Sequence, residues 1–552
     1  MDPFSYADLE VLVDDCCNFY RGQLEGRDGA FSKDRRDLAA WVHKFHEGCG
    51  TLTGNVKESI ERLNESPCVF LMTAHQPNLF AYAGVLRKAV LNHVLAGKIA
   101  NILKVPVVSF FGVADQDFTD DRWVRCATLP DVERRGGMLE LRSNLPEKTL
   151  LCKVEKPSKK VLDGWRKEVE DWLKRNLGIV ARGPVKIDSG SAGKVLSGNL
   201  DSFWSLVEAA HSRAENYSDF TGFILSKIVN EVWNYPTLFA RFSECQQIFR
   251  RQFETLLFRF DEYSELVRNA VSSVGCLGNG VCDDEFLTVP FWLHCDCGGK
   301  ARLTAEREGD SFSGVGRCLK CEKEYDVNLG SQEKADISKI ADKISARSIV
   351  MPLVFFEGLG ICSYVGGQGG REYLLQAKYV AEKMFQRFPV AVVWRPHDVY
   401  HGVGQVAASM TFEELSGKHL VSDYDPILRS LKENVECVQR ETDQLEAEKK
   451  RLLGDRNMKR EDKIDKLKRL SGQQADIRRL ADYTVLVRRL GLLENIGIVM
   501  DLHPCIIDYA VNIGLRVTAE QWAGFLSQSG SLSSDMKLIS ELDHVLPDLG
   551  QN

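Results

Sequence analysis

Short apolar runs that alternate with a helical pattern are the feature that most constrains the fold of this chain. Residues Cys68 to Met72 and Pro106 to Val113 are two such runs, and Ala83 to Ala100 between them has the apolar spacing of a helix. Because parallel strands need a crossover connection of a dozen or more residues, this order predicts a β-α-β unit. The chain is therefore expected to contain a parallel sheet.

The same pattern returns far downstream. Ile349 to Phe356, Ile361 to Val365 and Pro389 to Trp394 are predicted strands, and Arg371 to Phe385 is a predicted helix. We expect both blocks to form one α/β core that an insertion splits. The expected segments are an N-terminal helical segment (1–62), the first half of the core (63–140), a mixed, mainly helical insert (141–285), a β-rich insert (286–330), the second half of the core (331–420), a helical hairpin (421–490) and a C-terminal segment (491–552).

Composition sets the broad class of the protein. Of 552 residues, 44% are hydrophobic and 27% charged, which is close to the globular average and argues against global disorder. The net charge of -7 provides no overall field that favours nucleic acid or an anionic membrane. No segment reaches the roughly 18 consecutive apolar residues of a membrane helix, and residues 1–10 lack the pattern of a signal peptide. We expect a cytoplasmic protein.

A heptad pattern distinguishes the region from 426 to 490. Apolar residues recur at alternating spacings of four and three, imperfectly at Thr442 and Lys449, which predicts a helix with a coiled-coil seam. Gly454 to Asn457 is a predicted turn, and a second arm follows. The sequence therefore favours an antiparallel coiled-coil hairpin over two surface helices packed on the core. The predicted seam residues are Leu431, Val435, Val438, Thr442, Leu445, Lys449 and Leu452 in the first arm, and Ile464, Leu467, Ile477 and Leu480 in the second.

Four of the sixteen cysteines have the spacing of a metal site. Cys295 and Cys297 form one close pair, Cys318 and Cys321 form another, and glycines lie beside both pairs. Four thiolates in tetrahedral geometry suit zinc, and such a closed site is structural because it leaves no position for water. The alternatives are four unliganded cysteines, an iron–sulfur site, or a site in which His294 replaces one thiolate.

Ligands of a parallel sheet gather outside the carboxyl ends of its strands, and three loops here have that position. The first precedes a helix whose leading N–H groups can bind phosphate. His75 in this loop is a candidate to stabilise phosphate charge in the transition state, with turn capping as the alternative. Lys88, inside the helix, is a further candidate phosphate contact. Thr73, Gln76 and Asn78 complete the set of candidate binding residues in this region.

The second loop contains Asp115 and Asp117, which could hold a magnesium ion, orient an amine or act as a base. A helix N-cap explains one aspartate equally well. The third loop, Gly366-Gly367-Gln368-Gly369-Gly370, would let a ligand approach the backbone closely. Arg395 follows the last predicted strand, where it could pair with a substrate carboxylate or phosphate, or with a structural partner.

Five segments, in this order, resemble the bacillithiol biosynthesis cysteine-adding enzyme family. That family has a Thr-Gly-Gln-Gln-Pro-Gly loop before a lysine-bearing helix, a Val-Pro-Val strand ending in Glu-Asp-His-Asp-Phe, an Arg-Pro segment, a Tyr-Val-Gly-Gly loop before a tyrosine-bearing helix, and a later Pro-Arg stretch. The matching residues are Thr73-Ala74-His75-Gln76-Pro77-Asn78 with Lys88, Val105-Pro106-Val107 with Ala114-Asp115-Gln116-Asp117-Phe118, Met351-Pro352, Tyr364-Val365-Gly366-Gly367 with Tyr373, and Trp394-Arg395-Pro396.

The resemblance implies a nucleotidyltransferase-like Rossmann core, a dimer formed through the coiled coil, and a ligase that adds cysteine to the amine of glucosaminyl malate. It also implies a ligand site that includes Gly366, Gly367, Gln368 and Tyr373, with ATP or ADP and magnesium as candidate ligands. The chain departs from the family pattern at Ala114, Gln116 and Gly370, and the cysteine ribbon is absent from the bacterial pattern. These departures indicate a divergent branch, in which the fold carries over better than the substrate.

Two other functions compete with the cysteine ligase. The first is another nucleotidyl-transfer enzyme or ATP-using ligase that acts on a sugar or a tRNA. The second is a zinc-ribbon and coiled-coil protein that binds nucleic acid or a protein partner. The segment around the paired cysteines contains both basic and acidic residues, so its sequence does not favour nucleic-acid binding.

Overall fold

A five-stranded parallel sheet forms the core of the chain, in the order β12-β11-β1-β2-β5. The structure, a computed structural model, describes residues 2–64, 67–182, 189–274, 285–331, 334–395, 397–417, 420–480 and 482–545. The strands of the sheet are β1 (Val69–His75), β2 (Val107–Val113), β5 (Leu238–Arg241), β11 (Ile361–Gly366) and β12 (Val390–Val393).

The strand order changes direction at β1. From β1 the chain adds β2 and then β5 on one side, and later adds β11 and β12 on the other side. In doubly wound sheets the ligand lies outside the carboxyl ends of the two strands where such a change occurs. Here these strands are β1 and β11, which end at His75 and Gly366.

The sheet separates two hydrophobic cores. Side chains of a strand alternate between its faces, so Val69 and Leu71 of β1 lie in one core, and Phe70 and Met72 lie in the other. The first core includes α1 (Leu9–Phe19) and α4 (Ala83–Leu103), and the second includes α12 (Val350–Leu359) and α13 (Arg371–Met384). Both faces of the sheet are therefore covered, as a parallel sheet requires.

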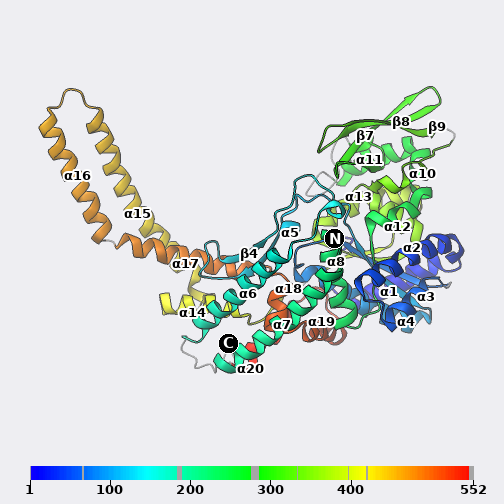
Figure 1. Ribbon diagram of the computed structural model, residues 1–552, viewed down its shortest axis with the longest axis horizontal. Coiled ribbons are helices and arrows are strands. Elements are labelled where there is room, and N and C mark those ends of the chain that lie inside the picture. The colour runs from blue at the N-terminus through cyan, green and yellow to red at the C-terminus, as the bar shows by residue number, and fades with distance from the viewer. Residues whose placement is uncertain are drawn as a thin grey trace.

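Further helices surround this core (Figure 1). No helix within the described ranges combines the length and the hydropathy that a bilayer crossing requires. The helices around the core are α2 (Asp28–Cys49), α3 (Gly54–Asn64), α6 (Lys159–Val180), α7 (Ser189–Arg213), α8 (Tyr217–Ser226), α9 (Phe242–Cys245), α10 (Arg250–Phe258), α11 (Phe260–Val274), α14 (Val403–Ser416), α17 (Tyr483–Asp501), α18 (Ile506–Asn512), α19 (Leu515–Ser529) and α20 (Glu541–Val545). A short antiparallel pair, β3 (Cys126–Pro130) and β4 (Met138–Arg142), lies between β2 and α6 in the sequence.

The predicted β-α-β unit is confirmed, because β1, α4 and β2 occupy the predicted positions and the two strands are paired in parallel. The predicted strand at 349–356 is wrong, because these residues belong to helix α12. Nine of its ten residues are buried, so the apolar run has no periodicity that separates a helix from a strand. Pro352 lies in the first turn, where a missing N–H is tolerated. Gly360, with φ of 60°, ends the helix directly before β11.

The predicted insert at 141–285 is not wholly outside the sheet. Strand β5, from within this range, pairs with β2 along Phe110 to Val113 and forms one edge of the sheet. The strand has only four residues and lies between helical segments, which is why its apolar pattern was not distinguishable from a helix.

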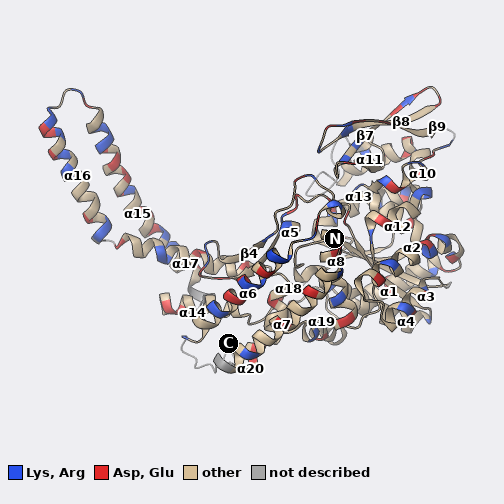
Figure 2. Ribbon diagram, viewed as in Figure 1, with Lys and Arg blue, Asp and Glu red and all other residues tan. Residues whose placement is uncertain are grey.

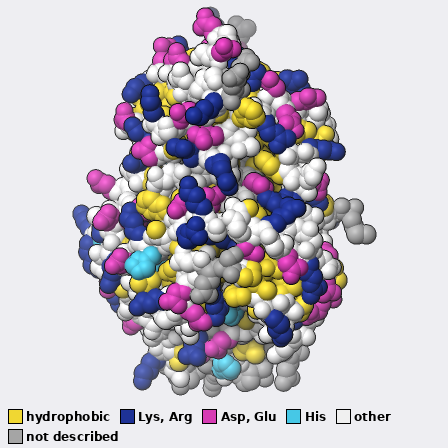
Figure 3. Space-filling view, turned by 90° about the vertical axis from the view of Figure 1, so that its right-hand side faces the viewer, with side chains coloured by type: hydrophobic (Ala, Val, Ile, Leu, Met, Phe, Trp, Pro, Cys, Tyr) yellow, Lys and Arg dark blue, Asp and Glu magenta, His cyan; other side chains and the backbone are white. Residues whose placement is uncertain are grey.

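A second, antiparallel sheet contains the four paired cysteines, in the order β10-β6-β7-β8-β9. We call the segment 286–331 the ribbon. Its sheet extends past the predicted boundary at 330, because β10 pairs with β6. Acidic and basic side chains are interspersed on the face of the molecule drawn in Figure 3. The strands are β6 (Phe291–His294), β7 (Lys300–Glu308), β8 (Ser311–Cys318), β9 (Glu324–Ser331) and β10 (Ile344–Ala346).

Two long helices, α15 (Leu420–Gly454) and α16 (Arg460–Leu480), pack side by side and project away from the rest of the molecule (Figure 1). Residues with both signs of charge cover this helical hairpin (Figure 2). All seven predicted seam residues of α15 are buried or half-buried. The polar seam residue Lys449 donates to Gln474 Oε1 across the hairpin at 2.6 Å.

The prediction for α16 is wrong at Ile464, whose exposed fraction is 42%. Lys463 is the half-buried residue at that turn, and its Nζ donates to the carbonyl oxygen of Leu453 at 3.4 Å and to that of Asp455 at 2.5 Å. A lysine that binds the last carbonyl groups of α15 stabilises the end of that helix. Leu470, with an exposed fraction of 8%, is the seam residue of α16 that the heptad pattern missed.

Replacing residues 440–482 with a short glycine–serine linker is expected to leave the rest of the chain folded. Tyr483 donates to Gln439 Oε1 at 2.5 Å, so the two cut ends lie close together. Thr442 and Leu470 are the only buried residues described between 440 and 480. Thermal unfolding should show a Tm within a few degrees of the full-length value, as expected for a change of about 1 kcal/mol or less. Loss of a cooperative transition would contradict this assignment.

Candidate functional site

His75 is the last residue of β1, and its ring is held in one tautomer. Its Nδ1 lies 3.0 Å from the carbonyl oxygen of Gln76, which can only accept, so Nδ1 carries the proton. Nε2 then accepts from the hydroxyl of Tyr82 at 3.4 Å. Burial, together with the charge of Lys88, lowers the pKa of His75 to about 3. The ring is therefore neutral near pH 7, with Nδ1 as its hydrogen-bond donor and Nε2 as its acceptor, and it carries no positive charge that would attract a phosphate.

Lys88 places a cation between the ends of β1 and β11. The residue lies in the second turn of α4 and has an exposed fraction of 4%. Its Nζ donates to the carbonyl oxygen of Ala74 at 3.3 Å. A Cβ atom at Gly367 would lie 3.3 Å from the same Nζ, so the loop after β11 approaches the ammonium closely. Burial lowers the pKa of Lys88 to about 7.

The glycine loop connects β11 to α13 and continues to Tyr373. At Gly370 a Cβ atom would lie 2.6 Å from the hydroxyl oxygen of Tyr373, so glycine is required there. Burial raises the pKa of Tyr373 to about 12, with Tyr364 and Asp117 as the nearby groups that also act on it.

The two predicted carboxylates have different partners. Asp115 is fully buried and accepts from the backbone N–H of Ser243 at 2.8 Å and from its hydroxyl at 2.6 Å. Burial raises the pKa of Asp115 to about 6, against the opposing effects of Arg241 and Ser243. Asp117 has a side-chain exposed fraction of 44%, and its Oδ1 lies 4.0 Å from Lys300 Nζ. Burial raises the pKa of Asp117, and Lys300 opposes this shift.

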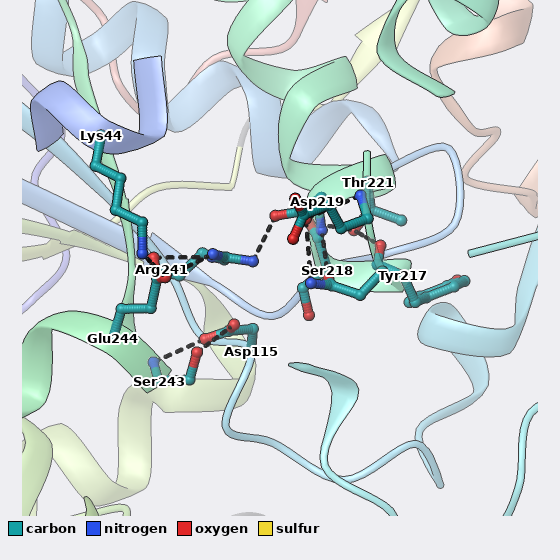
Figure 4. A network of polar contacts seen from close by, with 11 residues as sticks. Lys44, Asp115, Tyr217, Ser218, Asp219, Thr221, Arg241, Ser243 and Glu244 are labelled. Carbon is teal, nitrogen blue, oxygen red and sulfur yellow. Dashed lines mark hydrogen bonds and ion pairs between the residues drawn. The ribbon is translucent and has the colours of Figure 1, made fainter. Parts of the chain in front are cut away.

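A polar network fixes Asp115 at the end of β5 (Figure 4). Arg241, the last residue of β5, donates to Asp219 at 2.5 Å and pairs with Glu244 at 2.7 Å. Lys44 pairs with Glu244 at 2.7 Å. Both carboxylate oxygens of Asp115 accept from Ser243, beside the ion pairs of Arg241, so we assign Asp115 to structure and Asp117 to the candidate site.

The other candidate binding residues of the sequence analysis differ in how deeply they are buried. Thr73 is fully buried and donates to the carbonyl oxygen of Val365 at 2.7 Å, so it ties β1 to β11 instead of facing a ligand. Gln76 and Gln368 are half-buried, Asn78 and Gly366 are buried, and Pro396 lies outside the described residues. Arg395 is exposed and interacts electrostatically with Tyr82 and Glu372.

Seven residues thus gather at the carboxyl ends of the sheet, and we call them the switch-point cluster. Two of them, Tyr82 and Lys300, were not predicted. Tyr82 is the N-cap residue of α4, a position that the predicted start of the helix at Ala83 marks. No sequence signal connects Lys300 with Asp117, because the ribbon brings them together in space. The switch-point cluster comprises His75, Tyr82, Lys88, Asp117, Lys300, Tyr373 and Arg395.

The four predicted cysteines converge on one point of the ribbon. Their sulfur atoms all lie within 4.8 Å of one another, and His294 is not part of the group. Cys295 Sγ lies 3.6 Å from Cys321 Sγ, and Cys297 Sγ lies 3.6 Å from Cys318 Sγ. Sulfurs about 2.3 Å from a tetrahedral zinc ion lie roughly 3.8 Å apart. The four cysteines therefore fit a metal ion such as zinc.

Glycines shape the turn that carries the first cysteine pair. The N–H of Cys295 donates to the carbonyl oxygen of Gly299 at 2.9 Å, and Gly298 has φ of 82°, which favours glycine. A Cβ atom at Gly299 would lie 2.9 Å from Cys318 Sγ and 3.3 Å from Cys297 Sγ. A larger residue would therefore push the sulfurs apart.

Comparison with protein-family models and with curated proteins finds no match for this chain.

The purified protein is expected to contain about one zinc per chain. Cys321→Ser should lose the metal and lower the Tm, because metal-binding energy stabilises such a small module. Cys437→Ser is the matched control, since Cys437 is an exposed cysteine on α15. Metal analysis and thermal unfolding check both variants. Wild-type protein without metal, in which all four ribbon thiols react freely, would contradict the assignment.

Proposed function

We propose that this protein is a ligase that binds a phosphate-bearing activator such as ATP at the switch-point cluster and joins an amino acid to an amine. Cysteine is the first amino acid to test, and an amino-sugar conjugate such as glucosaminyl malate is the first acceptor, because of the family resemblance. The product would belong to low-molecular-weight thiol biosynthesis.

One observation carries the proposal: the buried ammonium of Lys88 faces Gly367 between the ends of β1 and β11. Read from the β5 edge, the strand order is 3-2-1-4-5, as in the first five strands of a Rossmann sheet, and supports a nucleotide site at this position. A buried cation without a counter-charge costs free energy, which an anionic ligand would offset. A phosphate group is the anion that suits a helix N-terminus with a lysine beside it.

The chemistry of amide formation fits the other members of the cluster. A free carboxylate must be activated before an amine can attack it, and phosphoryl or adenylyl transfer is a usual route. The neutral His75 ring presents Nε2 as a hydrogen-bond acceptor that would orient an N–H of the attacking amine. Arg395 carries a fixed positive charge for a substrate carboxylate or phosphate. A magnesium ion, if bound with ATP, would neutralise phosphate charge.

A ligase of this type acting on a sugar or a tRNA would use the same cluster, and the product distinguishes it. A nucleic-acid-binding function has less support. In the ribbon, Arg317 pairs with Glu324 at 2.5 Å and Lys323 pairs with Asp296 at 3.4 Å, so basic groups are neutralised locally.

The proposal includes a homodimer formed through the hairpin. The predicted seam of α15 faces α16 and α17 of the same chain, so the outer faces of the hairpin would provide the interface. Exposed apolar residues there include Leu453 and Ile464. Sedimentation of the full-length chain as a dimer, and of the hairpin deletion as a monomer, would support this assembly.

ATP binding is expected to weaken as the pH rises from 7.5 to 9.5. The charged form of Lys88 binds phosphate, and this form is lost above its pKa of about 7. The second pKa of a phosphate group is about 6, so the ligand does not titrate in this range. Isothermal titration should show up to about a tenfold loss of affinity per pH unit. Lys88→Arg should remove this pH dependence. Unchanged ATP affinity in Lys88→Ala would contradict the proposal.

His75→Ala and Asp117→Asn are expected to reduce turnover by about a hundred- to thousand-fold, since each removes a preorganised polar group. Mass spectrometry for an amide product, with ATP, cysteine and amino-sugar malates as substrates, measures this loss. Asp115→Asn is the matched comparison for Asp117→Asn and should instead lower the Tm, because Asp115 is bound by Ser243. The exposed His43 provides the control for His75. An Asp117→Asn enzyme with full activity would remove Asp117 from the mechanism.

A further inference from the structure

Lys300 is a buried lysine that the ribbon contributes to the switch-point cluster. It is the first residue of β7 and has an exposed fraction of 4%. Its Nζ lies 4.9 Å from the ring centroid of Phe118 and 5.7 Å from that of Trp292. Its ion-pair partner is Asp117, at 4.0 Å, which is beyond hydrogen-bond distance. None of the described residues accepts a hydrogen bond from its ammonium group.

The cysteine turn fixes the backbone on both sides of Lys300. Its carbonyl oxygen accepts from the N–H of Leu319, between Cys318 and Cys321, at 2.8 Å. Lys300 also pairs with His294 across β6 and β7. The metal-binding turns therefore determine where the Lys300 side chain begins.

The same turns are bonded to the segment that carries Asp117. The carbonyl oxygen of Gly298 accepts from the N–H of Leu150 at 2.7 Å, and the carbonyl oxygen of Asp117 accepts from the N–H of Leu151 at 3.1 Å. Lys320 adds a side-chain contact, since its Nζ donates to Thr149 Oγ1 at 2.8 Å. Segment 149–151 thus links the cysteine turns to Asp117, so the positions of Lys300 and Asp117 depend on one another.

Asp117 and Lys300 present opposite charges at a spacing that leaves both groups able to bind a ligand. An α-amino acid carries an ammonium and a carboxylate on one carbon atom, which is the complementary arrangement. Asp117 is accessible to solvent, and the buried Lys300 ammonium would gain the hydrogen bonds that it lacks. The charge of Asp117 acts on the Tyr373 hydroxyl, and the glycine loop that precedes Tyr373 passes Lys88. The pair is therefore connected to the place proposed for phosphate.

We propose that Asp117 and Lys300 form the amino-acid subsite of this protein, with Asp117 binding the α-ammonium, Lys300 binding the α-carboxylate, and the metal-bound cysteine turns holding Lys300 in place. This inference rests on the proposed ligase function and names its amino-acid site. It also gives the ribbon metal a positioning role at the site, without contact between the metal and the substrate.

Titration of the full-length, zinc-loaded protein with each of the twenty standard amino acids tests the subsite. The amino acid that binds most tightly is then titrated into Lys300→Ala, where we expect affinity to fall about 10- to 100-fold, the effect of losing one charge-assisted hydrogen bond. Lys300→Arg should retain part of the affinity. Lys323→Ala, which changes an exposed lysine of the same ribbon, should bind like the wild type.

Two derivatives of that amino acid separate the roles of the pair. Its amide lacks the carboxylate, so it should bind the wild type weakly and lose nothing further in Lys300→Ala. Its N-acetyl form lacks the ammonium, so Asp117→Asn should leave its affinity unchanged. Removal of zinc with a chelator should weaken binding of the parent amino acid as much as Lys300→Ala does, and added zinc should restore it. Unchanged affinity in Lys300→Ala, or in metal-free protein, would overturn the corresponding part of the proposal.

The failure of this subsite is distinguishable from the failure of the ligase function. If ATP binds in a Lys88-dependent manner but none of the twenty amino acids binds, the subsite is wrong while the nucleotide site stands. If ATP also fails to bind, the proposed function itself is wrong.

Discussion

The burial of the Lys88 ammonium where the strand order reverses is the constraint on which the proposed site depends. Thr73 bonds to Val365 and holds β1 against β11, and the glycine at position 367 lets the next loop approach the lysine. This arrangement leaves a cation with one protein hydrogen bond, to Ala74, among the described residues. A folded protein tolerates such a group when a ligand satisfies it during function.

The ribbon, which lies outside the parallel sheet, contributes Lys300 to the proposed site. Its cysteine turns fix Lys300 and, through segment 149–151, the loop that carries Asp117. Asp115, only two residues away from Asp117, instead accepts from the backbone N–H and the hydroxyl of Ser243. One loop thus provides a structural carboxylate, Asp115, and a carboxylate for the proposed site, Asp117, because burial and hydrogen bonding differ at the two positions.

Sequence periodicity predicted the helices and strands that have one apolar and one polar face, or that have turn residues at their ends. Strands β1 and β2 with helix α4 were found in this way, as was the seam of α15 with its polar positions Thr442 and Lys449. Helix α12 was mistaken for a strand because it is apolar on all sides, and β5 was missed because four residues carry too little pattern. Lys300 was missed for a different reason: it is far from Asp117 in the sequence, and only the tertiary structure brings the two residues together.

A crystal structure of the protein with ATP and its amino acid bound tests the central claim most directly. The account predicts a phosphate oxygen within hydrogen-bond distance of Lys88 Nζ, at roughly 2.7–3.2 Å. It predicts the amino acid between the Asp117 carboxylate and the Lys300 ammonium. A nucleotide bound elsewhere, with Lys88 still bonded only to the Ala74 carbonyl oxygen, would contradict the account.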